Sequence, residues 1–100
     1  MARVLDKFTP TYDLEKFKLS DYEITTTALR GAGELDLNRR GIAEVIATMK
    51  REHFYKSMTS YTNHKIWQDV YHVPFGDKTV YIKFTKGVIM EFRLLSFKEK

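Results

Sequence analysis

Residues 79–85 read TVYIKFT, and this stretch decides the fold class because its side chains alternate in character. In a β-strand, Val80, Ile82 and Phe84 share one face, while Tyr81 and Lys83 share the other. A strand with this pattern buries one face against a core and leaves the other open to solvent or to a ligand. The stretch therefore predicts a sheet with one open face.

Three further β-rich runs surround this stretch, at roughly residues 54–61, 66–73 and 88–97. The links between neighbouring runs are short and contain turn-forming residues. They are Asn63-His64, Pro74-Phe75-Gly76-Asp77 and Lys86-Gly87. Because a parallel crossover needs about a dozen residues, neighbouring runs are expected to pair antiparallel.

The first half of the chain carries the helical signals. Asp13 or Thr11 can cap a short helix that carries Leu14 and Phe17 inward. The strongest pattern follows Asn38, a plausible N-cap, where apolar residues recur at i, i+3, i+4 and i+7. They are Ile42, Val45, Ile46 and Met49, and the pattern predicts that they belong to the core.

A weaker helix and a short extended segment lie between these two helices. Residues 22–25 favour an extended conformation, and Thr26 or Thr27 can cap a helix that ends near Glu34. Helices followed by a meander of strands are typical of an α+β fold. We expect one domain that spans all 100 residues.

Composition excludes several classes of site. The chain has 100 residues, no cysteine and a formal net charge of +4, so disulfides and thiolate metal sites are excluded. The sequence contains no GxxxxGK[ST], HExxH or GxSxG motif, and the spacing of His53, His64 and His72 predicts no local metal site, so no cofactor is expected. With no signal peptide and no apolar run near the ~20 residues of a bilayer span, we expect a cytoplasmic protein.

The positive charge lies in the β-rich half of the chain. Residues 1–50 hold 8 Lys or Arg against 8 Asp or Glu, whereas residues 51–100 hold 9 against 5, which is the whole excess of +4. The second half also holds all three histidines and 10 of the 14 aromatic residues. Cations mixed with aromatic rings suit single-stranded nucleic acid, although aromatic residues also mark an ordinary β-rich core.

Several polar residues of the predicted strands have positions that need an explanation. Lys56 alternates in phase with Phe54 and Met58, and Gln68 alternates in phase with apolar neighbours. A lysine or an amide in such a line lies either at a strand end or in a cleft. His72 is a candidate acid or base, although it has no histidine partner nearby in the sequence.

Four motifs, in this order, make the chain resemble the MqsR family of toxin mRNA interferases. They are FYKSMT at residues 54–59, IWQDVY at 66–71, VYIK at 80–83 and SFKEK at 96–100. The resemblance extends back to about residue 22, while residues 1–20 carry no distinctive match. It implies a RelE-like fold, in which N-terminal helices pack on a curved, mainly antiparallel sheet.

The resemblance also implies an activity and a partner. Members of the family are ribonucleases that cut mRNA near GC-containing triplets without the ribosome, and a cognate antitoxin neutralises them. The implied antitoxin has a zinc-binding part and a DNA-binding helix-turn-helix part, and the free toxin is expected to be monomeric. Carried over by motif, the functional positions are Lys56, Gln68, Tyr81 and Lys98. We further expect RNA contacts from Lys83, Arg93, Tyr55 and His72.

These residue types fit cleavage of RNA without a metal ion, with the substrate's own 2′-hydroxyl as nucleophile. Lys56 and Lys98 would stabilise negative charge in the transition state, and either one could protonate the leaving oxygen. Tyr81 would orient or deprotonate the 2′-hydroxyl or stack on a base, and Gln68 would hydrogen-bond the phosphate or a base edge. A lysine acts as a base only where a neighbouring cation or burial lowers its pKa.

Two other functions are compatible with the same residues. The chain could be an RNA-binding module without catalysis, since the cations and rings would support binding alone. It could also be a small protein-interaction domain whose sheet edge pairs with a partner. Cyclic-phosphate ends on a cleaved RNA separate the nuclease from both alternatives.

Overall fold

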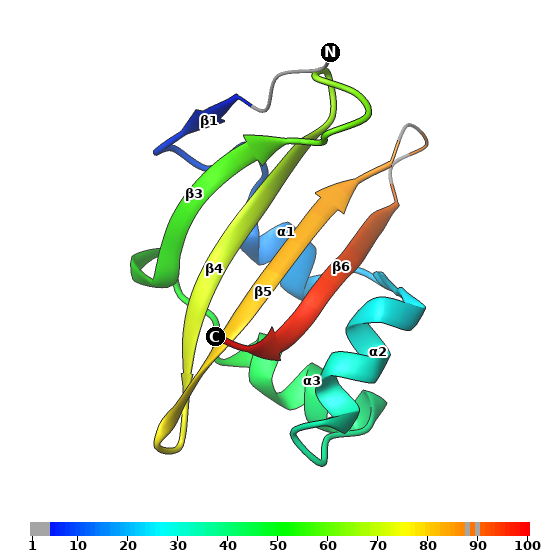
Figure 1. Ribbon diagram of the computed structural model, residues 1–100, viewed down its shortest axis with the longest axis vertical. Helices are drawn as coiled ribbons and strands as arrows, with labels where there is room; N and C mark the ends of the chain where they lie inside the picture. Colours follow the sequence, from blue (N-terminus) through cyan, green and yellow to red (C-terminus); the bar gives the residue numbers. More distant parts are fainter. Residues whose placement is uncertain (1–4, 88, 90) are drawn as a thin grey trace.

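The computed structural model describes residues 5–87, 89 and 91–100 and has the predicted α+β class (Figure 1). Its helices are α1 (Leu14–Leu19), α2 (Thr26–Gly33) and α3 (Arg39–Ala47), with a 3₁₀ turn η1 at Arg51–His53. Its strands are β1 (Asp6–Lys7), β2 (Glu23–Ile24), β3 (Phe54–Thr59), β4 (Trp67–Phe75), β5 (Lys78–Lys86) and β6 (Phe92–Glu99).

The strands form one sheet in the order β1-β3-β4-β5-β6-β2. The central strands β3, β4, β5 and β6 pair antiparallel, as their short links predict. At the edges, β1 pairs antiparallel with β3, whereas β2 pairs parallel with β6. Each edge strand is two residues long, too short to show a hydrophobic period, and β1 was not predicted from the sequence.

The predicted turn at residues 74–77 is longer than the turn in the structure. Pro74 pairs with Thr79 and Phe75 pairs with Lys78, so β4 and β5 are joined by two residues only. Gly76 adopts a φ of 60°, which a glycine tolerates at no steric cost. The last strand starts at Phe92 rather than at residue 88, and residues 88 and 90 lie outside the described part of the chain.

Side-chain caps define the start of each α-helix. Asp13 and Asn38 cap α1 and α3 as predicted, and their side chains accept hydrogen bonds from backbone amides in the first turn. The predicted caps of α2 are wrong by one or two residues. The cap is Thr25, whose backbone is still extended and whose hydroxyl accepts a hydrogen bond from the amide of Ala28 at 3.2 Å.

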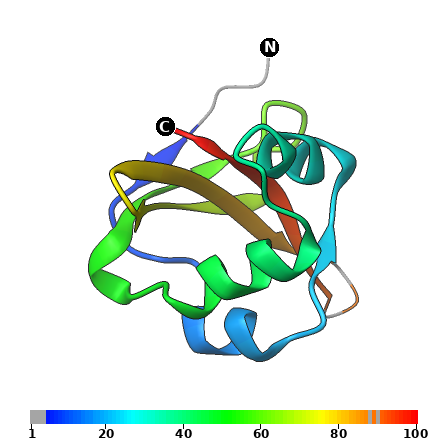
Figure 2. The ribbon, with the colours of Figure 1, turned by 90° about the horizontal axis from the view of Figure 1, so that it is seen from below.

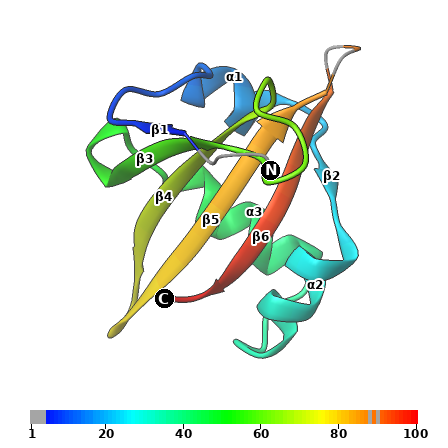
Figure 3. The ribbon, with the colours of Figure 1, turned by 45° about the horizontal axis from the view of Figure 1, so that its top comes forward.

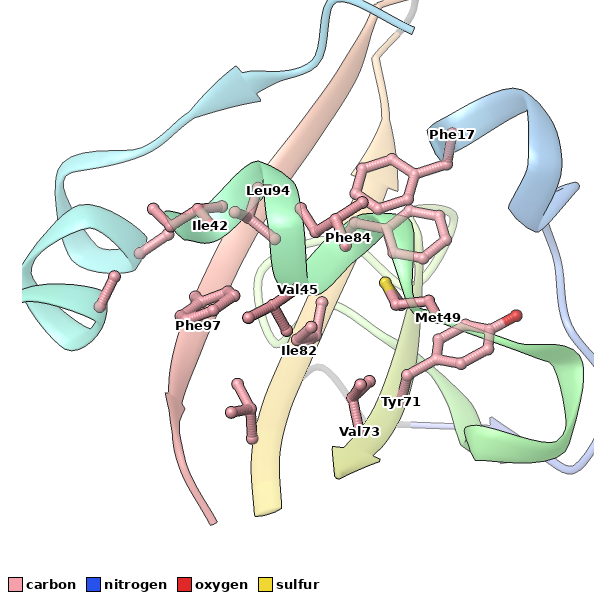
Figure 4. Close-up of a cluster of buried hydrophobic side chains, with 14 of the residues drawn as sticks. Phe17, Ile42, Val45, Met49, Tyr71, Val73, Ile82, Phe84, Leu94 and Phe97 are labelled. Atoms are coloured by element: carbon pink, nitrogen blue, oxygen red, sulfur yellow. The ribbon is translucent and has the colours of Figure 1, made fainter. Parts of the chain in front are cut away.

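The core lies between the sheet and the helices (Figures 2 and 4). Phe17 of α1 stacks on Phe84 of β5 with ring centroids 3.8 Å apart, which ties the first helix to the centre of the sheet. The four predicted apolar residues of the α3 pattern are buried, and so are all three apolar residues of TVYIKFT. All the large side chains of this cluster lie on one face of the sheet, so the polar residues between them lie on the other. Among the described residues, no helix is long and apolar enough to cross a membrane.

Candidate active site on the open sheet face

The helices leave one face of the sheet open (Figure 3). A row of aromatic and charged side chains crosses this face. His72 lies opposite Tyr81, and Tyr81 lies opposite Lys98. The ring centroids of His72 and Tyr81 are 6.0 Å apart, and Nζ of Lys98 lies 5.2 Å from the centroid of the Tyr81 ring. Tyr55 extends the row, because its ring stacks on His72 at 4.3 Å. We call these residues the Tyr81 row; it joins predicted catalytic and predicted RNA-binding residues.

A second row, which we call the Lys83 row, lies next to the first. Lys56 and Lys83 flank Val70, and Ser96 follows on β6. Val70 is fully buried although it is not part of the core cluster. On the open face, the neighbouring side chains have to cover it, and the apolar stems of two lysines are suited to do so. Two lysines, one on either side of Val70, therefore lie next to the Tyr81 row.

Lys56 reaches the open face because of a bulge in β3. The register shifts between Phe54 and Lys56, so that Phe54 pairs with Tyr71 and Lys56 pairs with Val70. The Phe54 ring packs edge-on against Tyr71 on the core side, with centroids 5.4 Å apart. The prediction that Lys56 and Phe54 share a face is therefore wrong. The bulge explains why a lysine is compatible with this position.

Gln68 and Arg93 lie farther along the sheet and do not join the Tyr81 row. Gln68 pairs with Met58, and Arg93 pairs with Thr85. At ~3.3 Å per residue, Gln68 is about 13 Å along β4 from His72. Both residues instead line a pocket of ≈ 400 Å³ on the same face. Its other lining residues are Ser60, Ile66, Thr85, Lys86, Gly87 and Leu95.

The cations of this face differ in whether a carboxylate neutralises them. Nζ of Lys56 lies 3.6 Å from Oδ2 of Asp6, and Nε of Arg93 lies 3.5 Å from Oε2 of Glu23. Lys83 and Lys98 form no ion pair with any described residue. An anion can therefore bind between Lys83 and Lys98 without displacing a carboxylate.

Burial and neighbouring charges shift three pKa values on this face. Burial, with a smaller effect of the Lys98 cation, lowers the pKa of Lys83 below its usual 10.5. Burial and then Lys100 lower the pKa of His72, so its imidazole is mostly neutral at pH 7. Burial raises the pKa of Tyr81, with a smaller contribution from Tyr55, so its phenol keeps its proton. The Tyr81 row thus offers a hydroxyl donor rather than a phenolate.

Two acidic residues that the sequence analysis did not single out hold the site together. Asp6 belongs to β1 and is paired with Lys56. Asp69 is fully buried, and its carboxylate accepts hydrogen bonds from the backbone amides of Thr11 and Tyr12 at 2.9–3.0 Å. These bonds fasten the N-terminal segment to the strand that carries Gln68 and His72. The sequence feature that could have identified Asp69 is its place as an aspartate within a strand of apolar residues.

The face can bind and polarise a phosphate. It presents the ammonium groups of Lys83 and Lys98, which are unpaired within the described part of the chain, together with a protonated phenol and a neutral imidazole in neighbouring rows. It also has aromatic rings on which a base can stack. Within residues 5–87, 89 and 91–100, no group of three or more His, Asp or Glu side chains is placed to hold a metal ion.

Comparison with known proteins identifies relatives over almost the whole chain. The family model described as "Motility quorum-sensing regulator, toxin of MqsA" matches residues 9–99. The match therefore starts well before residue 22 and includes α1. The mRNA interferase toxin MqsR of Escherichia coli (strain K12) is 40% identical over 100 residues, which cover 96% of this chain and 100% of the relative. Residues 9–99 contain the strands β3 to β6 of the open face and, apart from Lys100, all four motifs.

Proposed function

The chain belongs to the MqsR toxin family, and from this premise we propose that its open sheet face cleaves mRNA by attack of the substrate's 2′-hydroxyl. Membership makes the protein an mRNA interferase, an endoribonuclease that acts as the toxin of a toxin–antitoxin system. The observation that supports the chemistry most directly is that Lys83 and Lys98, which have no carboxylate partner among the described residues, lie beside Tyr81.

The scissile phosphate is proposed to bind over Lys83 and Lys98. The 2′-oxygen attacks phosphorus, the bond to the 5′-oxygen breaks, and the products are a 2′,3′-cyclic phosphate and a 5′-hydroxyl. Lys98 and Lys56 stabilise the charge on the phosphoryl oxygens, and either can protonate the departing 5′-oxygen. Tyr81 orients the 2′-hydroxyl by hydrogen bonding, because its raised pKa makes it a poor base at neutral pH.

Lys83 is the proposed acceptor of the 2′-hydroxyl proton. A lysine normally stays protonated at neutral pH, but burial and Lys98 both favour its neutral form. Lys83 also lies at the centre of the site, flanked along β5 by Tyr81 and Thr85. The base is thus assigned to a residue expected from the sequence only to contact phosphate.

The remaining details of the proposal follow the family resemblance. We propose that cleavage requires neither a metal ion nor the ribosome, and that it occurs near GC-containing triplets. A cognate antitoxin, with a zinc-binding part and a helix-turn-helix part, would neutralise the free, monomeric toxin in the cytoplasm. Helices on one side of a mainly antiparallel sheet support a RelE-like arrangement.

The test is cleavage of a long defined RNA by the purified protein in excess EDTA, with both ends of each cut mapped. We expect cyclic-phosphate and 5′-hydroxyl ends. Lys98→Ala should slow cleavage about 10²–10³-fold, the usual effect of losing one electrostatic donor. Lys16→Ala is the matched control, because it removes the same charge from an exposed position on α1. Binding of RNA without cleavage by the parent protein would refute the proposal and favour a binding module.

A further inference from the structure

The pocket of ≈ 400 Å³ beyond the Lys83 row has the composition of a ligand site. Ile66 and Leu95 supply apolar walls, and Ile66 is 40% exposed although it is a large apolar residue. Gln68 supplies an amide, whose side chain forms no hydrogen bond with any described residue. Arg93 and Lys86 place cations at its walls. Apolar walls with a few polar groups are typical of sites for flat organic molecules.

The position of the pocket restricts what such a molecule can be. On β4, Gln68 is one row from Val70, where Lys56 and Lys83 lie, and two rows from His72. Each row advances about 6.7 Å along the strand, so the pocket lies about one nucleotide's reach from the proposed phosphate position. A ligand that places one group in the pocket and a phosphate over the lysines is a nucleotide of the RNA.

We propose that this pocket binds the nucleobase of a nucleotide next to the scissile phosphate and selects which base is accepted there. The inference rests on the proposed cleavage function. The base is held between Ile66 and Leu95, and the Gln68 amide, which is both donor and acceptor, hydrogen-bonds the base edge. Lys86 binds the phosphate on the far side of that nucleotide, and Arg93 joins it by exchanging the Glu23 carboxylate for the phosphate.

In this arrangement the Tyr81 and Lys83 rows bind the phosphate, and the pocket binds a base. Lys83 and Lys98 contact a phosphate, which is the same in every nucleotide, so they carry no sequence information. Gln68 contacts a base edge, which differs between nucleotides. Loss of a pocket contact should therefore change the ranking of RNA sequences, whereas loss of a Tyr81-row contact should slow cleavage of all of them.

The test fills the pocket and measures cleavage of an RNA library randomised around one cleavage site. Ile66→Trp and Leu95→Trp should reduce the preference at one nucleotide position by about 5- to 150-fold, the range expected for one good base contact. Ile66→Trp keeps the test valid if Leu95→Trp does not fold, because Ile66 is exposed. Thr48→Trp is the matched control, since it fills a hollow of ≈ 240 Å³ beside α3, on the other side of the molecule.

Gln68→Met adds a second variant of similar size that lacks the amide. We expect it to flatten the preference at the same position as the Trp variants. An equal slowing of all library members would mean that Gln68 acts on the phosphate, and this result would overturn the inference. Unchanged preference in both Trp variants would also overturn it.

A binding experiment tests the pocket without cleavage. A 2′-deoxy analogue of the best RNA in the library cannot be cut and should shift the methyl resonances of Ile66 and Leu95. The methyl resonances of Ile46, buried in the core, are the internal control. If the parent protein cuts no RNA, the proposed function fails; if it cuts RNA but the pocket methyl groups do not shift, only the pocket inference fails.

Discussion

The Tyr71 hydroxyl provides a quantitative test of the fold that carries the site. Tyr71 is fully buried on β4, and its hydroxyl is a buried side-chain oxygen without a hydrogen-bond partner among the described residues. Burial, with a smaller effect of the Asp69 carboxylate, raises its pKa to about 12. In the unfolded chain a tyrosine has a pKa of about 10.

This difference makes stability depend on pH in a defined direction. Below about pH 10 both states keep the Tyr71 proton, and the shift has no effect. Between about pH 10 and 12 the unfolded chain loses the proton while the folded protein retains it, so the free energy of unfolding falls as the pH rises. At about pH 11, midway between the two pKa values, the free energy of unfolding has fallen by about 1.4 kcal/mol, because the unfolded chain is by then mostly deprotonated and the folded protein is not.

Tyr71→Phe removes both the titrating proton and the unpaired hydroxyl. At about pH 8 we expect it to leave stability unchanged or to raise it by about 1 kcal/mol, because a buried donor without a partner is costly. By about pH 11 its advantage over the parent should be larger by about 1.4 kcal/mol. Urea unfolding followed by circular dichroism at several pH values measures both quantities.

Other residues that titrate in this range are present in both proteins and cancel in the difference. They include Tyr22 and Tyr81, whose pKa values burial also raises. Tyr61→Phe, at a position 76% exposed, is the matched control for loss of a phenol. Parallel curves of stability against pH for Tyr71→Phe and the parent would refute the assignment of Tyr71 as a buried, raised-pKa group.

Three further substitutions test the site and its support. Lys83→Arg keeps the positive charge but removes the base, so kcat/KM should fall about 10²–10⁴-fold and should no longer increase as the pH rises. An unchanged dependence of kcat/KM on pH would refute the assignment of Lys83 as the base. Asp6→Asn removes the carboxylate that lies 3.6 Å from Nζ of Lys56 in the parent protein, so it should tighten binding of a 2′-deoxy oligonucleotide about two- to fivefold. Fluorescence anisotropy measures the affinity, and equal affinities would mean that Asp6 does not compete with RNA for Lys56. Gly31→Ala places a Cβ against the backbone of β6, the strand that carries Lys98, and should lower the free energy of unfolding in urea by about 1–3 kcal/mol. Gly33→Ala is the control, because there is open space around its Cβ. Equal stability of the two variants would contradict the packing of α2 on β6.

The sequence predicted the parts of the fold that have a clear period. TVYIKFT alternates over its whole length and forms the centre of β5, and the α3 pattern repeats over two turns and is buried as expected. Edge strands of two residues have no period, so β1 and the parallel pairing of β2 required the tertiary structure. Pro74 marked a turn by its residue type, but β4 continues through it.

The sequence motifs named the candidate site residues but not how they are arranged on the sheet. The family motifs pointed to Lys56, Gln68, Tyr81 and Lys98, and all of them line the open face. Alternation alone could not show that the bulge after Phe54 moves Lys56 to this face, because a bulge depends on the pairing of two strands. Nor could it separate Gln68 from the Tyr81 row, since distance along the sheet is set by the register.

Lys83 and Lys98 connect the stability of the free protein to its binding of RNA. Burial disfavours the charged form of Lys83, and Lys98 adds to this effect because the two ammonium groups repel each other in the free protein. The fold supplies carboxylates to Lys56 and Arg93 but none to this pair among the described residues, so the repulsion remains until an anion binds. A phosphate between them relieves it and raises the pKa of Lys83, so only the fraction of the protein in which Lys83 is neutral can accept the 2′-proton. In that fraction, transfer of the 2′-proton to Lys83 becomes easier as negative charge accumulates on the phosphoryl oxygens. The base becomes stronger as the transition state forms, because each increment of negative charge on the phosphoryl oxygens stabilises the ammonium that proton transfer creates.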